Sequence, residues 1–286
     1  MRSLLLSPID RWRAPPPLAR RVGWMGEWTY AHRGLHRGGL HSVGVPENSP
    51  SAFAAAIAAG MGIECDVQRS GDGRAIVFHD WEFDRLTGET GPVSDRSAQD
   101  IEKITLAGNN DPIPTLERFL DQVAGQVPIL IEIKSRNDRR VRPLCLAVHR
   151  ALEGYRGDHA VMSFDPRVSR WFAKYSPNTV RGLVVTEEKS KSLLGRLQRH
   201  GALWTAKPDF LAYDIRDLPS SFAAAQRRRG LPVLSWTVRS AVHRERAAQH
   251  ADAGIAEGDG IAGAKPRPEP KPKPEPEPKS GGADQA

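Results

Sequence analysis

The sequence has few cysteines and no long apolar run. Its 286 residues include only Cys65 and Cys145, which lie far apart and do not form a disulfide framework, so we expect a reducing compartment, the cytoplasm. No stretch approaches the ~20 consecutive apolar residues that span a bilayer. The leucine run at residues 4–6 is short and is soon followed by polar residues, so we expect neither a transmembrane segment nor a secretory signal.

The chain also lacks a basic face of the kind that binds nucleic acid. Its net charge is +7, but residues 1–22 carry a balance of +4 and residues 264–286 a balance of +1, which leaves only +2 for the body of the chain. No motif of interleaved aromatic and basic residues accompanies this excess, so we expect no DNA or RNA partner. For the basic arm, packing on the body is favoured, and peripheral contact with an anionic membrane is the alternative.

Three parts are expected along the chain. Residues 1–27 form the basic arm, and residues 28–263 carry the patterns of one folded domain. Residues 264–286 alternate proline with lysine, arginine or glutamate, a composition that cannot form a core. We expect this last part to be an extended, disordered tail.

Within the body, strand-like apolar runs alternate with helical patterns. The runs lie at residues 28–34, 62–68, 128–134, 159–164, 180–185, 210–215, 231–238 and, more weakly, 258–263. Helical patterns between them include residues 51–59, 115–123, 141–152 and 241–253. Such alternation predicts an α/β fold with a parallel sheet. Eight strands in about 240 residues favour a closed (β/α)8 TIM barrel over an open sheet.

Two features depart from a regular barrel. Residues 80–114 are rich in Gly, Thr, Asp and Asn and are expected to form an insertion after the second strand. The final β/α unit is weak, because the run at residues 258–263 is short and the tail follows it directly. A last barrel helix is therefore expected to be missing, and the amino-terminal arm is a candidate to cover the exposed edge.

Polar residues stand late in the predicted strands. They are His32 and Arg33 after the first run, Glu64 and Asp66 in the second, His79 after an added apolar run, and Glu132 and Lys134 in the third. Residues two apart in a strand share one face, and the carboxyl ends of barrel strands meet at one mouth. Charges inside apolar strands are costly unless they are paired or bound to an ion. This grouping therefore predicts a functional site.

The residue types at this site indicate an anionic substrate and a cation. Oxygen ligands from Glu64, Asp66 and Glu132 suit Mg²⁺ or Ca²⁺, whereas the lack of a cysteine or histidine cluster argues against zinc. Paired carboxylates would also suit a glycoside hydrolase. Arg33 and Lys134 favour a phosphorylated substrate instead, since a neutral sugar does not need their positive charge.

The segment "PENSPSAF" is expected to support the first strand. Ser49 can cap the helix that follows, with Pro50 at its first position. Glu47 and Asn48 would then lie in the loop near Arg33. Glu47 is either a metal ligand or the partner that holds Arg33, and we favour the partner role.

The triplet His-Arg-Gly occurs twice, at residues 32–34 and 36–38. The first copy ends the first predicted strand, so it is expected in the site. The second copy lies farther along the loop, and we expect it to be exposed and incidental.

The ordered motifs "AHRG", "PENSPSAF", "GIECDVQRSGDGRAIVFHD", "LIEIK" and "LSWTV" together resemble the glycerophosphodiester phosphodiesterase family. The resemblance implies a TIM barrel, a divalent cation, and hydrolysis of small glycerophosphodiesters to glycerol 3-phosphate and an alcohol. It also implies a role for each matching residue: Glu64, Asp66 and Glu132 as metal ligands, His32 and His79 as general acid and base, Arg33 and Lys134 at the phosphate, and Trp236 and Phe164 near the glycerol.

The resemblance leaves several alternatives open. The nucleophile is either water or the adjacent glycerol hydroxyl of the substrate, and either histidine is the acid. The rival functions are a lysophospholipase D-like enzyme acting at a membrane surface and a non-catalytic binding protein on the same barrel.

Overall fold

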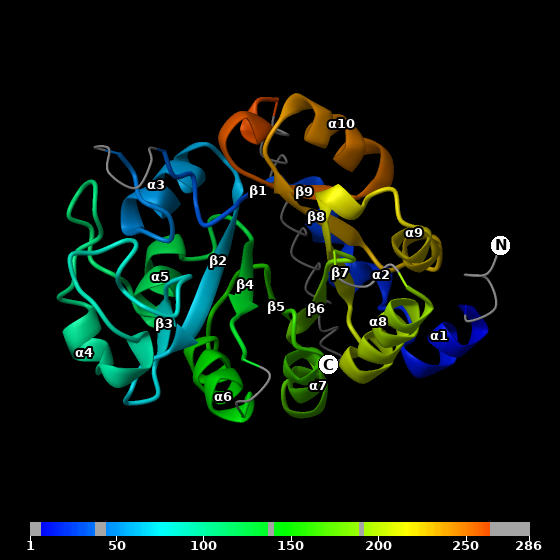
Figure 1. Ribbon diagram of the computed structural model, residues 1–286, viewed down its shortest axis with the longest axis horizontal. Helices are drawn as coiled ribbons and strands as arrows, with labels where there is room; N and C mark the ends of the chain where they lie inside the picture. The colour runs from blue at the N-terminus through cyan, green and yellow to red at the C-terminus, as the bar shows by residue number, and fades with distance from the viewer. Residues whose placement is uncertain (1–6, 38–43, 137–139, 189–191, 264–286) are drawn as a thin grey trace, which may run out of the picture.

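The computed structural model describes residues 7–37, 44–136, 140–188 and 192–263. Its centre is a barrel of parallel strands, closed because the first strand pairs with both the second and the last (Figure 1). The strands are β1 (Tyr30–Ala31), β2 (Gly62–Arg69), β4 (Ile129–Ile133), β5 (His159–Ser163), β6 (Val180–Val185), β7 (Phe210–Asp214), β8 (Val233–Val238) and β9 (Ala253–Ala256). The chain is therefore a TIM barrel, as predicted.

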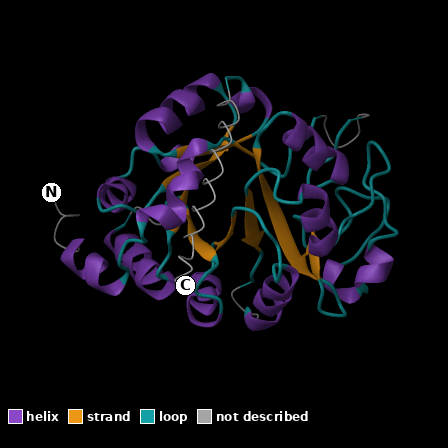
Figure 2. Ribbon diagram, turned by 180° about the vertical axis from the view of Figure 1, so that it is seen from behind, coloured by secondary structure: helices purple, strands orange, loops and turns teal. Residues whose placement is uncertain are grey.

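Helices form an outer layer around these strands (Figure 2). They are α3 (Pro50–Ala58), α5 (Leu116–Val123), α6 (Arg142–Ala151), α7 (Pro166–Tyr175), α8 (Leu193–Ala206), α9 (Ser221–Arg228) and α10 (Ala241–His250). The predicted cap of α3 is confirmed, because the Ser49 side chain accepts a hydrogen bond from the backbone N–H of Ala52 and Pro50 begins the helix.

Strand β2 shows how the fold positions functional side chains. Ile63, Cys65 and Val67 are fully buried in the apolar layer beneath α3 and α5. Side chains alternate along a strand, so Glu64 and Asp66 point to the opposite face, inside the barrel. One strand thus supplies both a core and two carboxylates.

An additional hairpin and an excursion follow β2. Strand β3 (Ala75–Val77) runs antiparallel to β2, and the next segment contains the 3-10 turn η3 (Val93–Asp95) and the short helix α4 (Ala98–Ile101). Phe78, Phe83 and Ile113 are among the residues of a separate apolar cluster here. The insertion after the second strand therefore has a small core of its own.

The described part of the arm packs on the body. Helix α1 (Ser7–Arg13) presents Asp10, a buried carboxylate that accepts hydrogen bonds from His200 and Trp204 of α8 and from Gln226 of α9, each 2.8 Å long. The idea that the arm covers the edge beside the last strand is therefore wrong for α1. Its partners are the helices that follow β6 and β7.

The rest of the arm lies at the amino-terminal end of the barrel. It forms α2 (Ala19–Val22) and the 3-10 turn η2 (Gly23–Glu27). Val22 and Met25 join the apolar cluster that contains Tyr30 of β1. Arg21 pairs with Asp209, which directly precedes β7, at 3.1 Å. This end of the barrel is opposite the mouth where the strands end.

The predicted last strand is misplaced. Residues 258–263 include the 3-10 turn η5 (Gly258–Ile261), and the eighth barrel strand is β9, which the predicted helix at residues 241–253 had partly absorbed. Alanine and glycine have little intrinsic preference for strands, so β9 exists through its pairing with β1 and β8. In the described chain no α-helix follows β9, and the predicted tail at residues 264–286 lies outside the described residues.

Within the part of the chain that the structure describes, no helix combines the length and apolar character needed to cross a membrane.

Candidate active site

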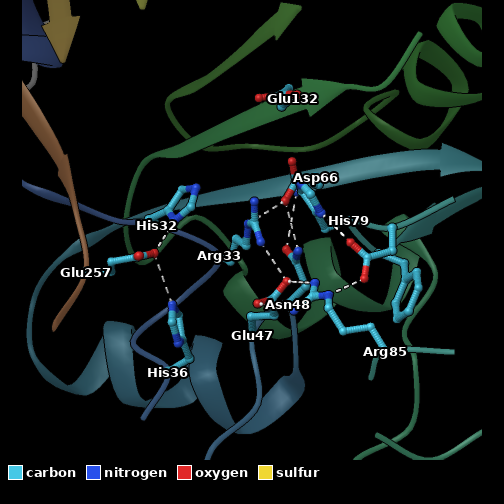
Figure 3. A network of polar contacts seen from close by, with 12 residues as sticks. His32, Arg33, His36, Glu47, Asn48, Asp66, His79, Arg85, Glu132 and Glu257 are labelled. Carbon is cyan, nitrogen blue, oxygen red and sulfur yellow. Dashed lines mark hydrogen bonds and ion pairs between the residues drawn. The ribbon is translucent and has the colours of Figure 1, made fainter. Parts of the chain in front are cut away.

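Three carboxylates, those of Glu64, Asp66 and Glu132, converge inside the mouth of the barrel, and Figure 3 shows Asp66 and Glu132. Asp66 of β2 and Glu132 of β4 are direct neighbours in the parallel register, and Glu64 lies two residues before Asp66 on the same face. One oxygen from each of the three carboxylates lies within 4.8 Å of the others, and all three residues are buried. The sequence-based grouping of these residues matches the geometry.

Two cations already neutralise part of this charge. Lys134 Nζ lies 2.9 Å from Asp66 Oδ1 and 2.8 Å from Glu132 Oε1, and Arg33 Nε lies 3.1 Å from Asp66 Oδ2. Burial raises the pKa of Asp66, but Lys134 and Arg33 outweigh it and hold that pKa well below its usual range. Asp66 is therefore a stable anion.

The pKa of Glu64, unlike that of Asp66, is raised by its surroundings. Burial, followed by the charges of Asp66 and Glu132, raises the pKa of Glu64 well above its usual value, although the backbone N–H of Arg33 donates to its Oε2 at 3.0 Å. This carboxylate needs either a proton or a further cation. The site offers three carboxylate oxygens, and the nearby cations do not fully neutralise the negative charge of Glu64. This set of donors fits a hard divalent cation such as Mg²⁺ or Ca²⁺.

His32 lies between this cluster and the end of the last strand. Its Nδ1 is 2.5 Å from Glu257 Oε2, and its Nε2 is 4.0 Å from Glu64 Oε2. A carboxylate only accepts, so the Nδ1–H donates to Glu257 and the lone pair of Nε2 faces the cluster. Burial lowers the pKa of His32, and Glu257 opposes that shift. Glu257 therefore selects the tautomer and orientation of His32.

His79 has the same arrangement on the other side of Asp66 (Figure 3). Its Nδ1 is 2.6 Å from Asp80 Oδ1, and Asp80 is held in turn by Arg85. His79 also lines a cavity of about 650 Å³ together with Lys134 and Phe164. Each predicted catalytic histidine thus has a carboxylate on Nδ1 and leaves Nε2 for other partners.

The loop before α3 supports the site through Glu47 and Asn48. Glu47 accepts hydrogen bonds from Arg33 at 2.7 Å and from Arg85 at 2.6 Å, which supports the role of partner over that of ligand. The Asn48 side chain donates to Asp66 Oδ2 at 3.0 Å and accepts from the Asp66 backbone N–H at 3.2 Å. Arg33 and Asn48 both have positive φ, 55° and 54°, a conformation that is costly for arginine and tolerated by asparagine.

The two predicted aromatic residues meet at the mouth. The rings of Phe164 and Trp236 are in edge contact, with centroids 5.4 Å apart, and Phe164 is 47% exposed. The indole N–H of Trp236 donates to the backbone carbonyl of Ala212, so its donor is already used. Trp236 can offer a substrate its apolar surface.

The sequence model of the glycerophosphoryl diester phosphodiesterase family matches residues 32–261. This chain belongs to that family. Among curated relatives, it is 38% identical to the glycerophosphodiester phosphodiesterase of Caldanaerobacter subterraneus over 110 residues, 35% of this chain and 44% of the relative. It is 29% identical to glycerophosphodiester phosphodiesterase 1 of Bos taurus over 159 residues, 52% of this chain and 47% of the relative. The chain thus spans about half the length of the curated relatives it matches.

Solved structures share the fold. A phosphodiesterase from Oleispira antarctica, in complex with the product sn-glycerol-3-phosphate, aligns with a TM-score of 0.67 and 20% identity over 80% of this chain and 92% of that one. A glycerophosphodiester phosphodiesterase from Thermotoga maritima aligns with a TM-score of 0.63 and 24% identity over 82% and 94%. At these identities the comparisons establish the barrel alone.

In this member of the glycerophosphoryl diester phosphodiesterase family, the second His-Arg-Gly copy lies partly beside the site. The prediction that it is exposed is wrong for His36, whose side chain is only 21% exposed and whose Nε2 lies 3.5 Å from Glu257 Oε2. The reason is that β1 pairs with β9, so His36 and Glu257, which follow these two strands, lie near each other (Figure 3).

Sequence reasoning also missed two residues that support the histidines. Glu257 escaped notice because the last strand was placed too late, although it directly follows β9 and so stands where functional residues of a barrel are expected. Arg85 lies in the insertion, five positions after Asp80, in the run "DRLTGETG" that also matches the family, but no role was assigned to it.

Proposed function

We propose that this protein hydrolyses glycerophosphodiesters to glycerol 3-phosphate and an alcohol, with the help of a divalent cation. The observation that carries the proposal is the convergence of Glu64, Asp66 and Glu132 within 4.8 Å, flanked by two histidines. Family membership supports the same reaction. The Oleispira antarctica phosphodiesterase, which was solved in complex with the product sn-glycerol-3-phosphate, also supports glycerol 3-phosphate as the product.

The three carboxylates would hold the cation, Mg²⁺ or Ca²⁺. When bound, the cation supplies positive charge that offsets the negative charge developing on the phosphoryl group. Arg33 and Lys134 add two fixed positive charges on the same side of the barrel. They bind and orient the anionic phosphate, which would otherwise repel a nucleophile.

His32 and His79 transfer protons at their Nε2 atoms, since Glu257 and Asp80 occupy both Nδ1 atoms. One histidine takes the proton from the attacking hydroxyl and the other gives a proton to the leaving alkoxide. The attacking group is water or the adjacent hydroxyl of the glycerol moiety. Phe164 and Trp236 provide the apolar wall for the glycerol carbons.

A direct test is product formation from glycerophosphocholine. Wild-type protein is expected to release choline and glycerol 3-phosphate, and Glu132→Gln is expected to lose most of this activity because one cation ligand becomes neutral. Glu153→Gln, on an exposed carboxylate after α6, is the matched control. Binding of glycerophosphocholine by wild-type protein without any product would instead favour the non-catalytic alternative.

One observation favours a second candidate, the hydrolysis of lysophospholipids at a membrane surface. Leu193, Leu194 and Leu197, in the first turns of α8, are 70%, 65% and 50% exposed. Helix α8 begins after the carboxyl end of β6, so these leucines lie toward the same end of the barrel as the site. Exposed leucines at this end could contact lipid while the substrate enters the mouth.

For the compartment we propose the cytoplasm. Both cysteines, Cys65 and Cys145, are free and buried. A protein with free thiols and no disulfide among its cysteines is typical of a reducing environment.

A further inference from the structure

A second group of potential metal ligands lies beside the three carboxylates. One ligand atom from each of His32, His36 and Glu257 lies within 4.8 Å of the others. The side chains are partly buried, with 12%, 21% and 19% of their surface exposed. Figure 3 shows both histidines directed at the carboxylate of Glu257 from opposite sides.

The contacts of His36 are incomplete as they stand. Its Nε2 is buried and makes no hydrogen bond of good geometry among the described residues; its neighbour is Glu257 Oε2, an ion-pair contact of 3.5 Å. A buried polar atom without a partner is costly and is usually satisfied by an ion or a water molecule. Nothing in the proposed phosphodiesterase mechanism uses this atom.

We propose that His32 Nδ1, His36 Nε2 and Glu257 form a binding site for Zn²⁺. Two imidazoles and one carboxylate are a donor set typical of zinc, with water as the fourth ligand. In a tetrahedral site with bonds of about 2.0–2.1 Å, neighbouring ligand atoms lie about 3.3 Å apart. The 3.5 Å between His36 Nε2 and Glu257 Oε2 fits this spacing, whereas the 2.5 Å between His32 Nδ1 and Glu257 Oε2 is that of a hydrogen bond and must lengthen when zinc replaces the proton between the two atoms. Arg239 pairs with the other oxygen of Glu257, so Oε2 is left for the metal.

The two sites select different ions by their donors. Glu64, Asp66 and Glu132 offer oxygen only, which Mg²⁺ and Ca²⁺ prefer. The second site offers two nitrogens, which those ions bind weakly and zinc binds well. Both sites can therefore be filled at once by different metals.

Zinc at this site would inhibit the reaction, a consequence that rests on the proposed function. Coordination requires the lone pair of His32 Nδ1, so the single N–H proton of the neutral imidazole must shift, through solvent, from Nδ1 to Nε2. Nε2 then carries that proton and can no longer accept another. Zinc also withdraws Glu257 from its hydrogen bond with His32. Both changes remove the arrangement on which proton transfer depends.

Metal binding can be tested without measuring activity. Protein saturated with Mg²⁺ is titrated with Co²⁺, a spectroscopic substitute for zinc whose visible absorption is strong in tetrahedral sites. We expect strong absorption for the wild type and a loss of at least about tenfold in Co²⁺ affinity for His36→Ala and His36→Asn. His149→Ala, on α6, is the matched control and should bind as the wild type does.

Zinc inhibition is then measured at saturating Mg²⁺, with each variant compared with itself in the absence of zinc. The zinc concentration that halves activity should rise at least about tenfold in both His36 variants. If His36→Ala and His36→Asn keep the wild-type Co²⁺ spectrum and zinc sensitivity, the proposed site is wrong. If the Co²⁺ absorption depends on His36 but the protein cleaves no phosphodiester, the zinc site stands and the proposed function fails.

Discussion

Glu257 Oε2 lies 2.5 Å from His32 Nδ1, although 225 positions separate the two residues in the chain. The contact exists because the barrel closes: β1 pairs with β9, so the residues that follow these two strands stand side by side. Closure of the barrel therefore also places the carboxylate that orients His32, the proposed catalytic histidine.

Removal of this carboxylate should alter the titration of His32. Glu257 raises the pKa of His32 against the lowering effect of burial, so Glu257→Ala should lower that pKa. We expect the limb of the pH–rate profile that reflects His32 to move to lower pH, whether His32 is the acid or the base, with kcat reduced and KM nearly unchanged. Glu245→Ala, an exposed residue on α10, is the control. A profile that stays in place would show that Glu257 does not act through His32.

The two histidines should behave as a unit. His32→Ala and His79→Ala are each expected to lower kcat by roughly 10²-fold or more, because each transfers a proton in the reaction. The double variant should lose much less than the product of the two single losses, since both act in one step. In zinc-free buffer, His36→Ala should lose clearly less than His32→Ala. Equal losses would mean that the two His-Arg-Gly copies were assigned to the wrong roles.

The sequence allowed the central part of the site to be predicted, for a definite reason. Glu64 and Asp66, like Glu132 and Lys134, sit two apart in otherwise apolar strands, and local periodicity alone places each pair on one face. Glu257 depends instead on a four-residue strand of alanine, glycine and isoleucine whose position is decided by pairing with β1 and β8. Tertiary contacts of this kind leave little local signal.

The amino-terminal arm could not be placed from its charge either. The sequence favours packing of the arm on the body, but the five arginines of the arm give no indication of where it packs, and the residue that docks α1 is a carboxylate, Asp10. The partners of Asp10 on α8 and α9 lie 190 and 216 positions away. No pattern within residues 1–27 identifies them.

Asp10→Ala should therefore destabilise the protein. The change leaves His200, Trp204 and Gln226 without their shared acceptor in a buried position. We expect a loss of about 1–3 kcal/mol in the free energy of unfolding, measured by urea denaturation followed by tryptophan fluorescence. Asp121→Ala is the control, because Asp121 is an exposed carboxylate on α5, away from α1. An unchanged urea midpoint for Asp10→Ala would mean that α1 is not docked in solution.

Substrate preference separates the two candidate enzymes. Because Phe164 and Trp236 would contact only the glycerol side, glycerophosphocholine, glycerophosphoethanolamine and glycerophosphoglycerol should have kcat/KM values within about tenfold of one another, a spread of ~1.4 kcal/mol. Lysophosphatidylcholine should be clearly worse, with or without anionic vesicles.

The exposed leucines of α8 provide the matched test of the lipid alternative. Leu193→Ser combined with Leu197→Ser should leave the hydrolysis of glycerophosphocholine unchanged, since neither side chain contacts the residues of the site. If the wild type strongly prefers the lysolipid and this variant does not, the substrate is a membrane-bound lysophospholipid and the proposal of a water-soluble substrate is wrong.

The central claim is that Glu64, Asp66 and Glu132 hold a divalent cation required for phosphodiester hydrolysis. The most direct measurement is the rate of glycerol 3-phosphate release from glycerophosphocholine by wild-type protein after chelation, and again after Mg²⁺ or Ca²⁺ is restored. We predict that chelation abolishes the rate, that one of these two cations restores it, and that Glu132→Gln is restored only weakly. Full turnover by the thoroughly chelated protein would contradict the account.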